Sequence, residues 1–330
     1  MQRTNHWIKQ WLNPKNIIAG ALLVLLYGAV QGLIASGSLS IYYQLNLILM
    51  LINIILAVSL NLINGFTGQF SLGHAGFMAV GAYTSAVLTL KLGQPYFLAL
   101  MAGALAAAVI GFIIGIPTLR LRGDYLAIAT LGFGEILRVV LINISYVGGA
   151  AGMTGIPRYT TWTVAFWMAV FSVLVIKNLV NSSYGRACVA VREDEIAAET
   201  MGINTTYYKV LAFAVGAFFA GIAGGLYAHY FFIIQPATFG FLKSIDILLM
   251  VVIGGLGSLT GSILAAAVLT AVSAFLQEFA AVRMIVYALV LILMMIFRPQ
   301  GLLGTRELSW RGIWPEGGNG GAYPADKKAN

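Results

Sequence analysis

The chain has 330 residues, of which 60% are hydrophobic and 9% are charged, against about 25% charged in an ordinary soluble protein. Residues 16–90 carry no formal charge. Only lipid can cover so much apolar surface, so the composition excludes a soluble enzyme, a nucleic-acid-binding protein and a disordered protein. The net charge of +8 is better explained by basic cytoplasmic loops of a membrane protein than by a nucleic-acid partner.

Continuous apolar runs predict an all-α, polytopic integral membrane protein with about ten transmembrane helices, and about eight as the lower bound, because a span needs about 20 apolar residues. Outer-membrane strands would instead show short alternating segments. The first run could also be a cleaved signal peptide, although it is longer than usual for one. The predicted spans are 17–38, 41–63, 72–90, 97–118, 125–145, 160–181, 209–231, 243–256, 259–278 and 284–298.

The distribution of Lys and Arg predicts the orientation. With the N-terminus inside, the inside loops hold fourteen of the 19 basic residues, the outside loops hold four, and Arg138 lies within a span. We therefore expect cytoplasmic ends at 1–16 and 299–330 and a transmembrane domain at 17–298. The single cysteine, Cys188, falls in a predicted cytoplasmic loop and is expected to be a reduced structural thiol.

The motifs of common membrane enzymes are missing from the sequence. There is no Gly-Lys dipeptide and hence no phosphate-binding Walker A loop, and there is no His-Glu-x-x-His or Gly-x-Ser-x-Gly. This pattern favours a transporter or channel over an enzyme, and it predicts neither a metal site nor a bound cofactor. If ATP drives transport, another subunit must bind it.

A glycine-rich segment after the second span predicts a break in the helix. Unwound backbone is tolerated at membrane depth only where protein or a water-filled cavity satisfies it, and transporters place such breaks on the substrate pathway. The alternative is a tight cytoplasmic turn followed by a packed helix, in which His74 has a polar packing role rather than a role in proton transfer. The candidate pathway or gate residues here are Asn61, Gly65, Gly68, Gln69, Ser71, Gly73 and His74.

A second break is predicted at 254–261, Gly-Gly-Leu-Gly-Ser-Leu-Thr-Gly, whose glycine spacing echoes that of the first. Paired interrupted segments in two halves of a chain point to the central site of a transporter. This adds Gly254, Gly255 and Gly257 to the candidate pathway residues.

Glu135 and Arg138 lie near the middle of the fifth span, three residues apart and so on one helix face. Isolated charges there would be costly, so we expect an intramembrane ion pair. A pair that locks the helix bundle is favoured over a functional site.

The loop 182–208 is the most informative polar segment. Residues 194–201 predict a short helix with acidic residues at its N-terminus, and Gly202 and Asn204 suit its C-terminal exit. So short a helix is marginal in water. We therefore expect it to dock in a groove on a partner protein, the alternative being that it rests on its own helix bundle.

The run from Glu195 to Gly202, Glu-Ile-Ala-Ala-Glu-x-x-Gly, resembles the coupling helix of ABC importer permeases. Roughly residues 45–305 are similar to the branched-chain amino acid permeases (Liv family). The order of the shared motifs is that of the LivM-type rather than the LivH-type subunit. Glu193 and Glu195 straddle the position of the family's first acidic residue. The motifs that carry the resemblance lie at 60–83, 119–125, 152–157, 184–226 and 297–302.

The resemblance implies an ABC importer permease fold in the lipid bilayer of the cytoplasmic (inner) membrane of a prokaryote, and a set of partners. These are a second homologous permease subunit, two cytoplasmic ATPase subunits that bind and hydrolyse ATP, and an extracytoplasmic substrate-binding protein. It implies import of branched-chain or other hydrophobic amino acids, with urea or short amides as the alternative. A less favoured alternative is an ion-coupled secondary transporter that uses Glu135, Asp246 or His74. The implied ATPase-coupling residues are Arg192, Glu193, Glu195, Ala197, Ala198, Glu199 and Gly202.

Overall fold

The computed structural model describes residues 14–118, 121 and 123–276, and the single positions 289, 292, 293, 296, 297, 301 and 304. The chain divides into two units, one of residues 1–24 and 308–330 and the other of residues 25–307. In the first unit the described residues, 14–24, form the start of helix α2 (Pro14–Ala35). The second unit contains the fold and the candidate site.

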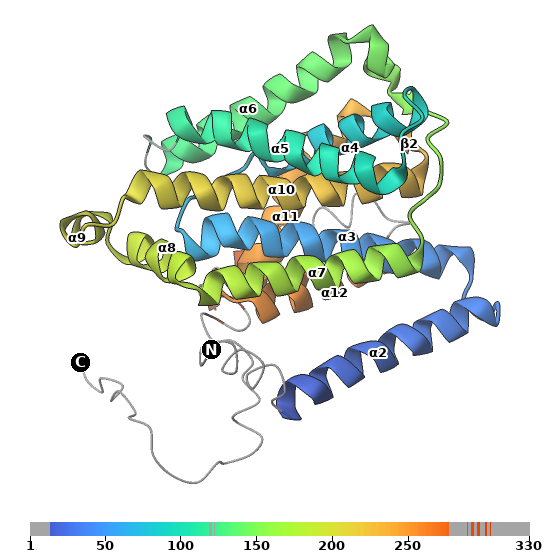
Figure 1. The fold of residues 1–330 in the computed structure, drawn as a ribbon, viewed down its shortest axis with the longest axis horizontal. Helices are drawn as coiled ribbons and strands as arrows, with labels where there is room; N and C mark the ends of the chain where they lie inside the picture. Colours follow the sequence, from blue (N-terminus) through green and yellow to red (C-terminus); the bar gives the residue numbers. More distant parts are fainter. Residues whose placement is uncertain are drawn as a thin grey trace, which may run out of the picture. The chain divides into compact units, whose positions relative to one another are not determined.

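Helices make up nearly all of the described part of the second unit (Figure 1). Four short helical turns, η1 to η4, and one two-stranded antiparallel ribbon connect them, with Met153 opposite Ile234 in the ribbon. The α-helices are α3 (Ile41–Asn61), α4 (His74–Leu90), α5 (Tyr96–Thr118), α6 (Asp124–Asn143), α7 (Trp162–Asn181), α8 (Ser183–Glu193), α9 (Glu195–Thr200), α10 (Thr205–Phe231), α11 (Phe241–Gly254) and α12 (Leu259–Phe275). The short elements are η1 (Leu62–Phe66), η2 (Ser145–Val147), η3 (Gly149–Ala151), β1 (Met153–Thr154), β2 (Ile233–Ile234) and η4 (Pro236–Phe239).

The prediction of an all-α polytopic membrane protein is confirmed. Among the described residues, five helices are long and apolar enough to cross a membrane, and α4, α12 and part of α2 are shorter apolar helices. Nine of the predicted spans coincide with helices, and the tenth, 284–298, lies almost entirely outside the described residues. Helix α8 and the β1–β2 ribbon were not predicted from the sequence. The domain boundaries at 16 and 298 stay predictions.

Helix α10 lies at the centre of the bundle, between α5 on one side and α3 on the other (Figure 1). Small residues let its backbone approach its neighbours. A Cβ on Gly224 would lie 2.0 Å from the carbonyl oxygen of Met78 in α4, and one on Gly81 would lie 2.2 Å from that of Gly221. Small-residue contacts of this kind hold helices together in lipid, where apolar burial between helices supplies little driving force.

The loops are sorted between the two ends of the bundle as the predicted topology requires. The segments around Gly68, Gly123 and Arg192 line one common cavity at one end. At the other end, Lys91 donates a hydrogen bond to the carbonyl of Tyr146. The positive-inside count assigns the first end to the cytoplasm, and that assignment stays a prediction.

Candidate functional site

The two glycine breaks, far apart in sequence, meet around the buried side chain of Asn61 at the end of α3. Its Oδ1 accepts a hydrogen bond from the backbone N–H of Gly257 (2.9 Å). Its Nδ2 donates to the carbonyl of Ser258 (2.8 Å) and to Ser262 Oγ (2.9 Å). There is no room for a side chain at Gly65, where a Cβ would lie 1.8 Å from Asn61 Oδ1 and 2.3 Å from the nitrogen of Gly257. The two glycine-rich segments, which have similar glycine spacing in the sequence, therefore also contact each other in the structure.

The first break is unwound, and several of its backbone groups are hydrogen-bonded to the protein. Helix α3 continues into the π-helical turn η1, and α4 begins only at His74. Between them the Asn64 side chain accepts a hydrogen bond from the Ser71 N–H (3.2 Å), and the Gln69 N–H bonds to the carbonyl of Ile63 (3.1 Å). The predicted break is confirmed, and protein groups satisfy the opened backbone as the membrane requires.

The second break is a tight turn between α11 and α12. Gly255 and Gly257 have positive φ values of 110° and 88°, a region that favours glycine. A Cβ on Gly261 would lie 2.0 Å from the carbonyl oxygen of Gly254, so the two helix ends cross with no space between them. The break at 254–261 is confirmed as well.

Arg192, the penultimate residue of α8, bonds to the first break and lies close to the second. Its Nη1 donates to the carbonyl of Gly65 (2.9 Å), and its guanidinium also pairs with Glu193. A Cβ on Gly68 would lie 2.8 Å from Arg192 Cγ, and one on Gly257 would lie 2.8 Å from Nη1. Its guanidinium points inward to the breaks, and its predicted role in ATPase coupling stays a prediction.

The predicted short helix is present as α9 and is capped at both ends. Asp194 Oδ1 accepts hydrogen bonds from the N–H groups of Ile196 (2.9 Å) and Ala197 (3.0 Å). Gly202 has φ +83° and its N–H bonds to the carbonyl of Glu199 (2.9 Å). The expected role of Asn204 in this exit is wrong. Its side chain accepts from the Tyr207 N–H (3.0 Å) and caps the start of α10 instead.

The acidic residues of α9 fasten it to α10. Glu195 forms an ion pair with Lys209 (2.5 Å), and Glu199 Oε1 accepts a hydrogen bond from Thr205 Oγ1 (2.7 Å). Of the predicted pair of alanines, Ala197 is exposed and Ala198 is buried against the chain. Both glutamates therefore hold the helix in position, in addition to any contact with a partner.

The outward surface of α9 carries apolar side chains that the sequence analysis passed over. Ile196 is 66% exposed and Met201 is 82% exposed, and α9 lies beyond the ends of α8 and α10 (Figure 1). The two apolar residues could have been noticed in the sequence, because neighbouring apolar side chains exposed in a polar loop mark an interaction surface. Behind α9, a cavity of about 230 Å³ separates it from the first break, with Gln69, Arg192 and Lys209 in its wall.

The remaining predicted pathway residues each contact the protein around the first break, although Gln69 Oε1, Ser71 Oγ and His74 Nδ1 are buried without a hydrogen-bond partner. His74 is buried and its Nε2 hydrogen-bonds with Ser59 Oγ (2.8 Å), while Gln69 Nε2 donates to the carbonyl of Lys209 (3.2 Å). Gly73 packs against Thr130 of α6, whose carbonyl oxygen would lie 2.4 Å from a Cβ there. This geometry fits polar packing at His74.

Glu135 and Arg138 form an ion pair on α6. Arg138 Nε donates to Glu135 Oε2 (2.7 Å), and Glu135 Oε1 accepts from the Phe241 N–H at the start of α11 (3.2 Å). The two side chains are 34% and 30% exposed. The pair therefore joins α6 to the end of α11 that is remote from the breaks, and its role stays a prediction.

Cys188 lies in α8, outside the membrane-spanning helices. It is buried, and its thiol donates to the carbonyl of Tyr208 (3.9 Å). Burial raises the pKa of the thiol above its ordinary value. Among the described residues, no group of His, Cys, Asp and Glu side chains is arranged to hold a metal ion.

Apolar spans, two apposed helix breaks and a helical loop hydrogen-bonded to the first break define a polytopic membrane transport permease. The family model for the permease component of branched-chain amino acid transport systems matches residues 42–297, and the chain belongs to this family. It is 39% identical over 290 residues to the LivM permease of Escherichia coli, which covers 77% of this chain and 68% of that protein.

Other relatives are of both subunit types. The LivM permease of Salmonella typhimurium is 38% identical over 288 residues, or 77% of this chain and 68% of the relative. The LivH permease of the same organism is 25% identical over 284 residues, or 77% of this chain and 92% of the relative. All three are described as permease proteins of a high-affinity branched-chain amino acid transport system. No solved structure matches the chain.

Proposed function

We propose that this chain is a transmembrane permease subunit of an ATP-driven ABC importer for branched-chain amino acids. The substrate class rests on what the relatives are named for transporting. The coupling mechanism rests on one observation, the hydrogen bond from Arg192 to the carbonyl of Gly65. Because the chain has no Walker A loop, ATP is bound and hydrolysed by two separate cytoplasmic subunits, and this subunit catalyses no reaction and needs no cofactor.

The contacts of α9 support a coupling role. Ile196 and Met201 offer an apolar surface to a groove on an ATPase. The opposite side of the helix is held by the Glu195–Lys209 ion pair. A displacement of α9 by the ATPases is therefore transmitted to α10 through Lys209, and to the glycine breaks through Arg192.

The glycine breaks supply the element that such a displacement can change. Asn61 holds the end of α3 to the α11–α12 turn, and Arg192 braces the carbonyl of Gly65 beside it. We infer that this junction is the cytoplasmic gate, closed while the bonds are intact. Loss of the Arg192 bond would free the π-helical turn and the second break to separate.

The assembly that this function requires has four further components. A second homologous permease subunit completes the pathway, consistent with the similarity of this chain to both LivM and LivH proteins. Two ATPases lie at the α9 end, which is cytoplasmic, as are both termini. An extracytoplasmic binding protein delivers the amino acid at the other end.

Reconstitution tests the proposal. The chain is co-expressed with its permease partner and ATPases, inserted in proteoliposomes, and supplied with the binding protein and radiolabelled leucine. We expect uptake that requires ATP and the binding protein. Gradient-driven uptake by the chain alone would identify a secondary transporter, and transport of urea without leucine would refute the amino acid substrate.

A further inference from the structure

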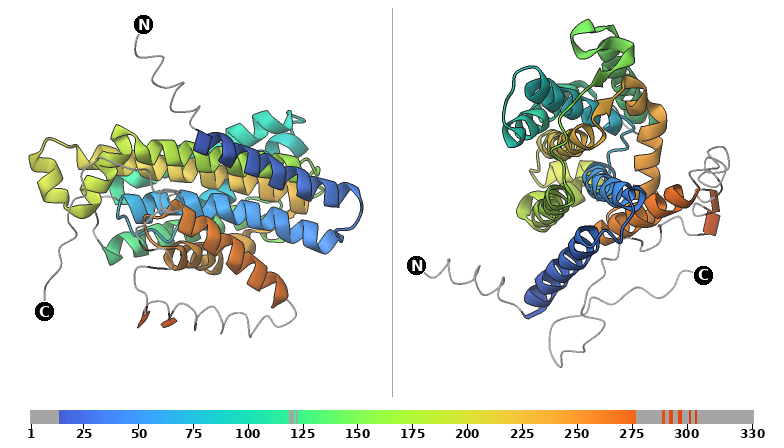
Figure 2. Two further views of the ribbon diagram at one scale, coloured as in Figure 1. Left: turned by 90° about the horizontal axis from the view of Figure 1, so that it is seen from below. Right: turned by 90° about the vertical axis from the view of Figure 1, so that its right-hand side faces the viewer.

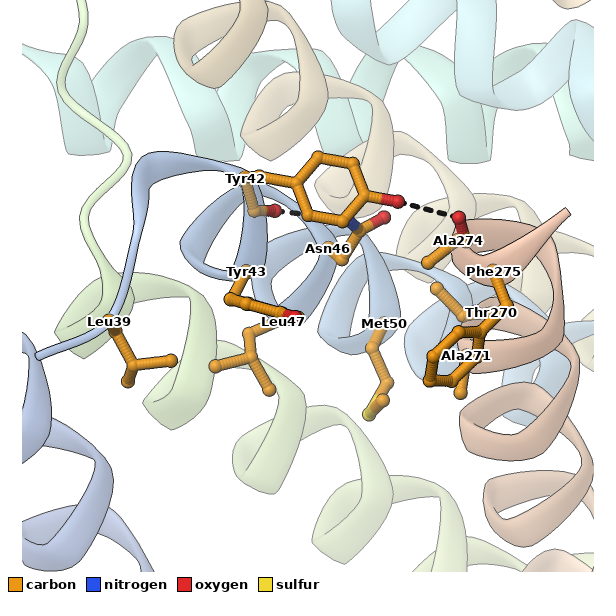
Figure 3. A pocket seen from close by; sticks show the side chains of 10 residues that line it. All are labelled: Leu39, Tyr42, Tyr43, Asn46, Leu47, Met50, Thr270, Ala271, Ala274 and Phe275. Atoms are coloured by element: carbon orange, nitrogen blue, oxygen red, sulfur yellow. Dashed lines mark hydrogen bonds between the residues drawn. The ribbon is translucent and has the colours of Figure 1, made fainter. Parts of the chain in front are cut away.

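The three helices that meet at the glycine breaks also enclose open space toward their opposite ends. A cavity of about 680 Å³ lies between the start of α3 and the end of α12, two helices that lie side by side (Figure 2). Its wall is mainly apolar and aromatic, with Tyr43, Leu47, Met50 and Phe275 around it (Figure 3). Tyr42 donates to the carbonyl of Ala274 (2.5 Å) across the top of the two helices. The volume is in the range of small-molecule sites.

A second cavity, of about 210 Å³, adjoins the first and has a different chemistry. The two share Asn46, Thr270 and Ala274 in their walls. The second also contains Lys243 and Asp246, one turn apart on α11. A positive and a negative charge thus lie on one helix face beside an apolar chamber.

Hydrogen bonds connect the wall of the second cavity across all three helices. Lys243 Nζ of α11 donates to Asn53 Oδ1 of α3 (3.1 Å), and Asn53 Nδ2 donates to Thr270 Oγ1 of α12 (3.0 Å). Asn53 is only 6% exposed. Polar groups at membrane depth are costly and mark substrate pathways, so this row is not an ordinary feature of a lipid-facing helix surface.

The polar row extends toward the gate. Asn46, Asn53 and Asn61 of α3 are separated by seven and eight residues, or about two helical turns each, so they follow one stripe along the helix. The first lines both cavities, the second lies in the wall of the second cavity, and the third holds the glycine breaks together. The stripe therefore leads from the cavities to the junction at Gly65.

We propose that the two joined cavities are a substrate-binding segment of the translocation pathway, which holds a hydrophobic amino acid as its zwitterion. The apolar chamber takes the branched side chain. The Lys243 ammonium lies where the α-carboxylate would bind, and the Asp246 carboxylate and Asn53 Oδ1 lie where the α-ammonium would bind. Thr270 accepts the hydrogen bond from Asn53 Nδ2 and so positions the Asn53 amide. This inference rests on the proposed function, and it places substrate recognition on α3, α11 and α12 rather than in the glycine breaks.

Cysteine substitution in the reconstituted importer tests the location. Cys188 is replaced by serine, and Met50→Cys is compared with Val109→Cys, a matched control on α5 that is 56% exposed and does not line either cavity. We expect leucine turnover to slow the reaction of Met50→Cys with a small thiol reagent at least about fivefold. Complete modification at this position should abolish uptake, and the control should show neither effect.

A second pair of variants tests the polar row. Thr270→Val removes a hydroxyl that bonds to the carbonyl of Ala266 in its own helix (2.7 Å), and Thr118→Val removes the same kind of bond to Ile114 (2.7 Å) away from the cavities. We expect Thr270→Val to lower kcat/KM for leucine about fivefold, because Asn53 Nδ2 loses its hydrogen-bond acceptor in the cavity wall. Thr118→Val should transport normally.

The outcomes distinguish failure of the proposed function from failure of the proposed substrate-binding segment. If the wild-type complex carries no leucine, the proposed function is wrong and this inference is wrong with it. If the wild-type complex carries leucine but Met50→Cys behaves like Val109→Cys, only the substrate-binding segment is refuted, whatever the yield of the Thr270 variant. Equal reaction rates of Met50→Cys with and without leucine would also overturn the inference.

Discussion

The guanidinium of Arg192 donates a 2.9 Å hydrogen bond to the carbonyl oxygen of Gly65, although the two residues are 127 positions apart in the chain. Gly65 is in the turn where α3 loses its regular winding, and Arg192 ends the helix that leads into α9. This bond joins the helix that precedes the exposed α9 to the place where the two helix breaks meet.

Arg192→Lys should uncouple ATP hydrolysis from transport without unfolding the permease. The three N–H groups of a lysine lie on one nitrogen atom. They cannot reach the Gly65 carbonyl and the Glu193 carboxylate together, as the separate nitrogens of the guanidinium do. We expect leucine-stimulated ATPase activity and uptake to fall about tenfold, the effect of losing one charge-assisted bond. The control is Arg186→Lys, exposed on the same helix, and equal loss in both variants would refute the role of Arg192.

Gly65→Ala should prevent the junction from forming. The added methyl group would overlap Asn61 Oδ1 and the Gly257 backbone, and overpacking costs about 3 kcal/mol or more when backbone cannot shift. Fluorescence-detected size-exclusion chromatography after heating should show a clearly lower melting temperature or no folded peak. Gly132→Ala, which meets no atom within 4 Å, should stay within about 1 kcal/mol of wild type. Similar stability of the two variants would contradict the junction.

Ile196→Ala should weaken binding of the ATPases. The side chain is exposed on α9, so its removal leaves the fold of this chain intact, and a buried apolar anchor at an interface contributes about 1 kcal/mol or more. We expect about a tenfold loss of affinity, measured by titrating purified ATPase onto the permease in nanodiscs. Ile113→Ala, equally exposed but on α5, is the control, and undiminished binding by Ile196→Ala would place the interface elsewhere.

Glu135→Gln should lower stability rather than alter transport directly. Arg138 would lose its charged partner and the Phe241 N–H would lose a carboxylate acceptor. At this partly exposed position the cost should be about 1–3 kcal/mol. Thermal melting of Glu135→Gln, Arg138→Gln and the double variant forms a cycle, in which the double variant should lose less than the sum of the singles. Normal melting with lost transport would indicate a pathway role instead.

Cys188 should react slowly with maleimide in the folded protein. Its pKa is raised by burial, so the reactive thiolate is scarcer at a given pH than for a free cysteine, and the reaction should accelerate as the pH rises toward that raised pKa. We expect labelling at pH 7 to be at least about tenfold slower than for Ser183→Cys on a Cys188→Ser background, an exposed position of the same helix. Equal rates would show that the thiol is accessible.

Much of the fold follows from properties that are local in the chain. A run of apolar residues long enough to span a bilayer becomes a helix wherever it packs, because its backbone must bond to itself in lipid. Glycines mixed with polar residues interrupt such a run, so the breaks at 64–73 and 254–261 could be located from the sequence. The boundaries of α9 were also readable, since the Asp194 cap and the positive φ of Gly202 act over a single turn.

Which residues form the candidate site was decided only by the tertiary structure. Asn61 bonds to Gly257, Asn53 to Lys243, and Arg192 to Gly65, and in each pair the partners are separated by more than a hundred residues. Hydrophobic periodicity assigns a side chain to one face of its own helix, but it carries no information on which other helix that face meets. The inward direction of Arg192 and the cavities between α3, α11 and α12 arise from helix packing, which depends on close contacts among small residues throughout the bundle.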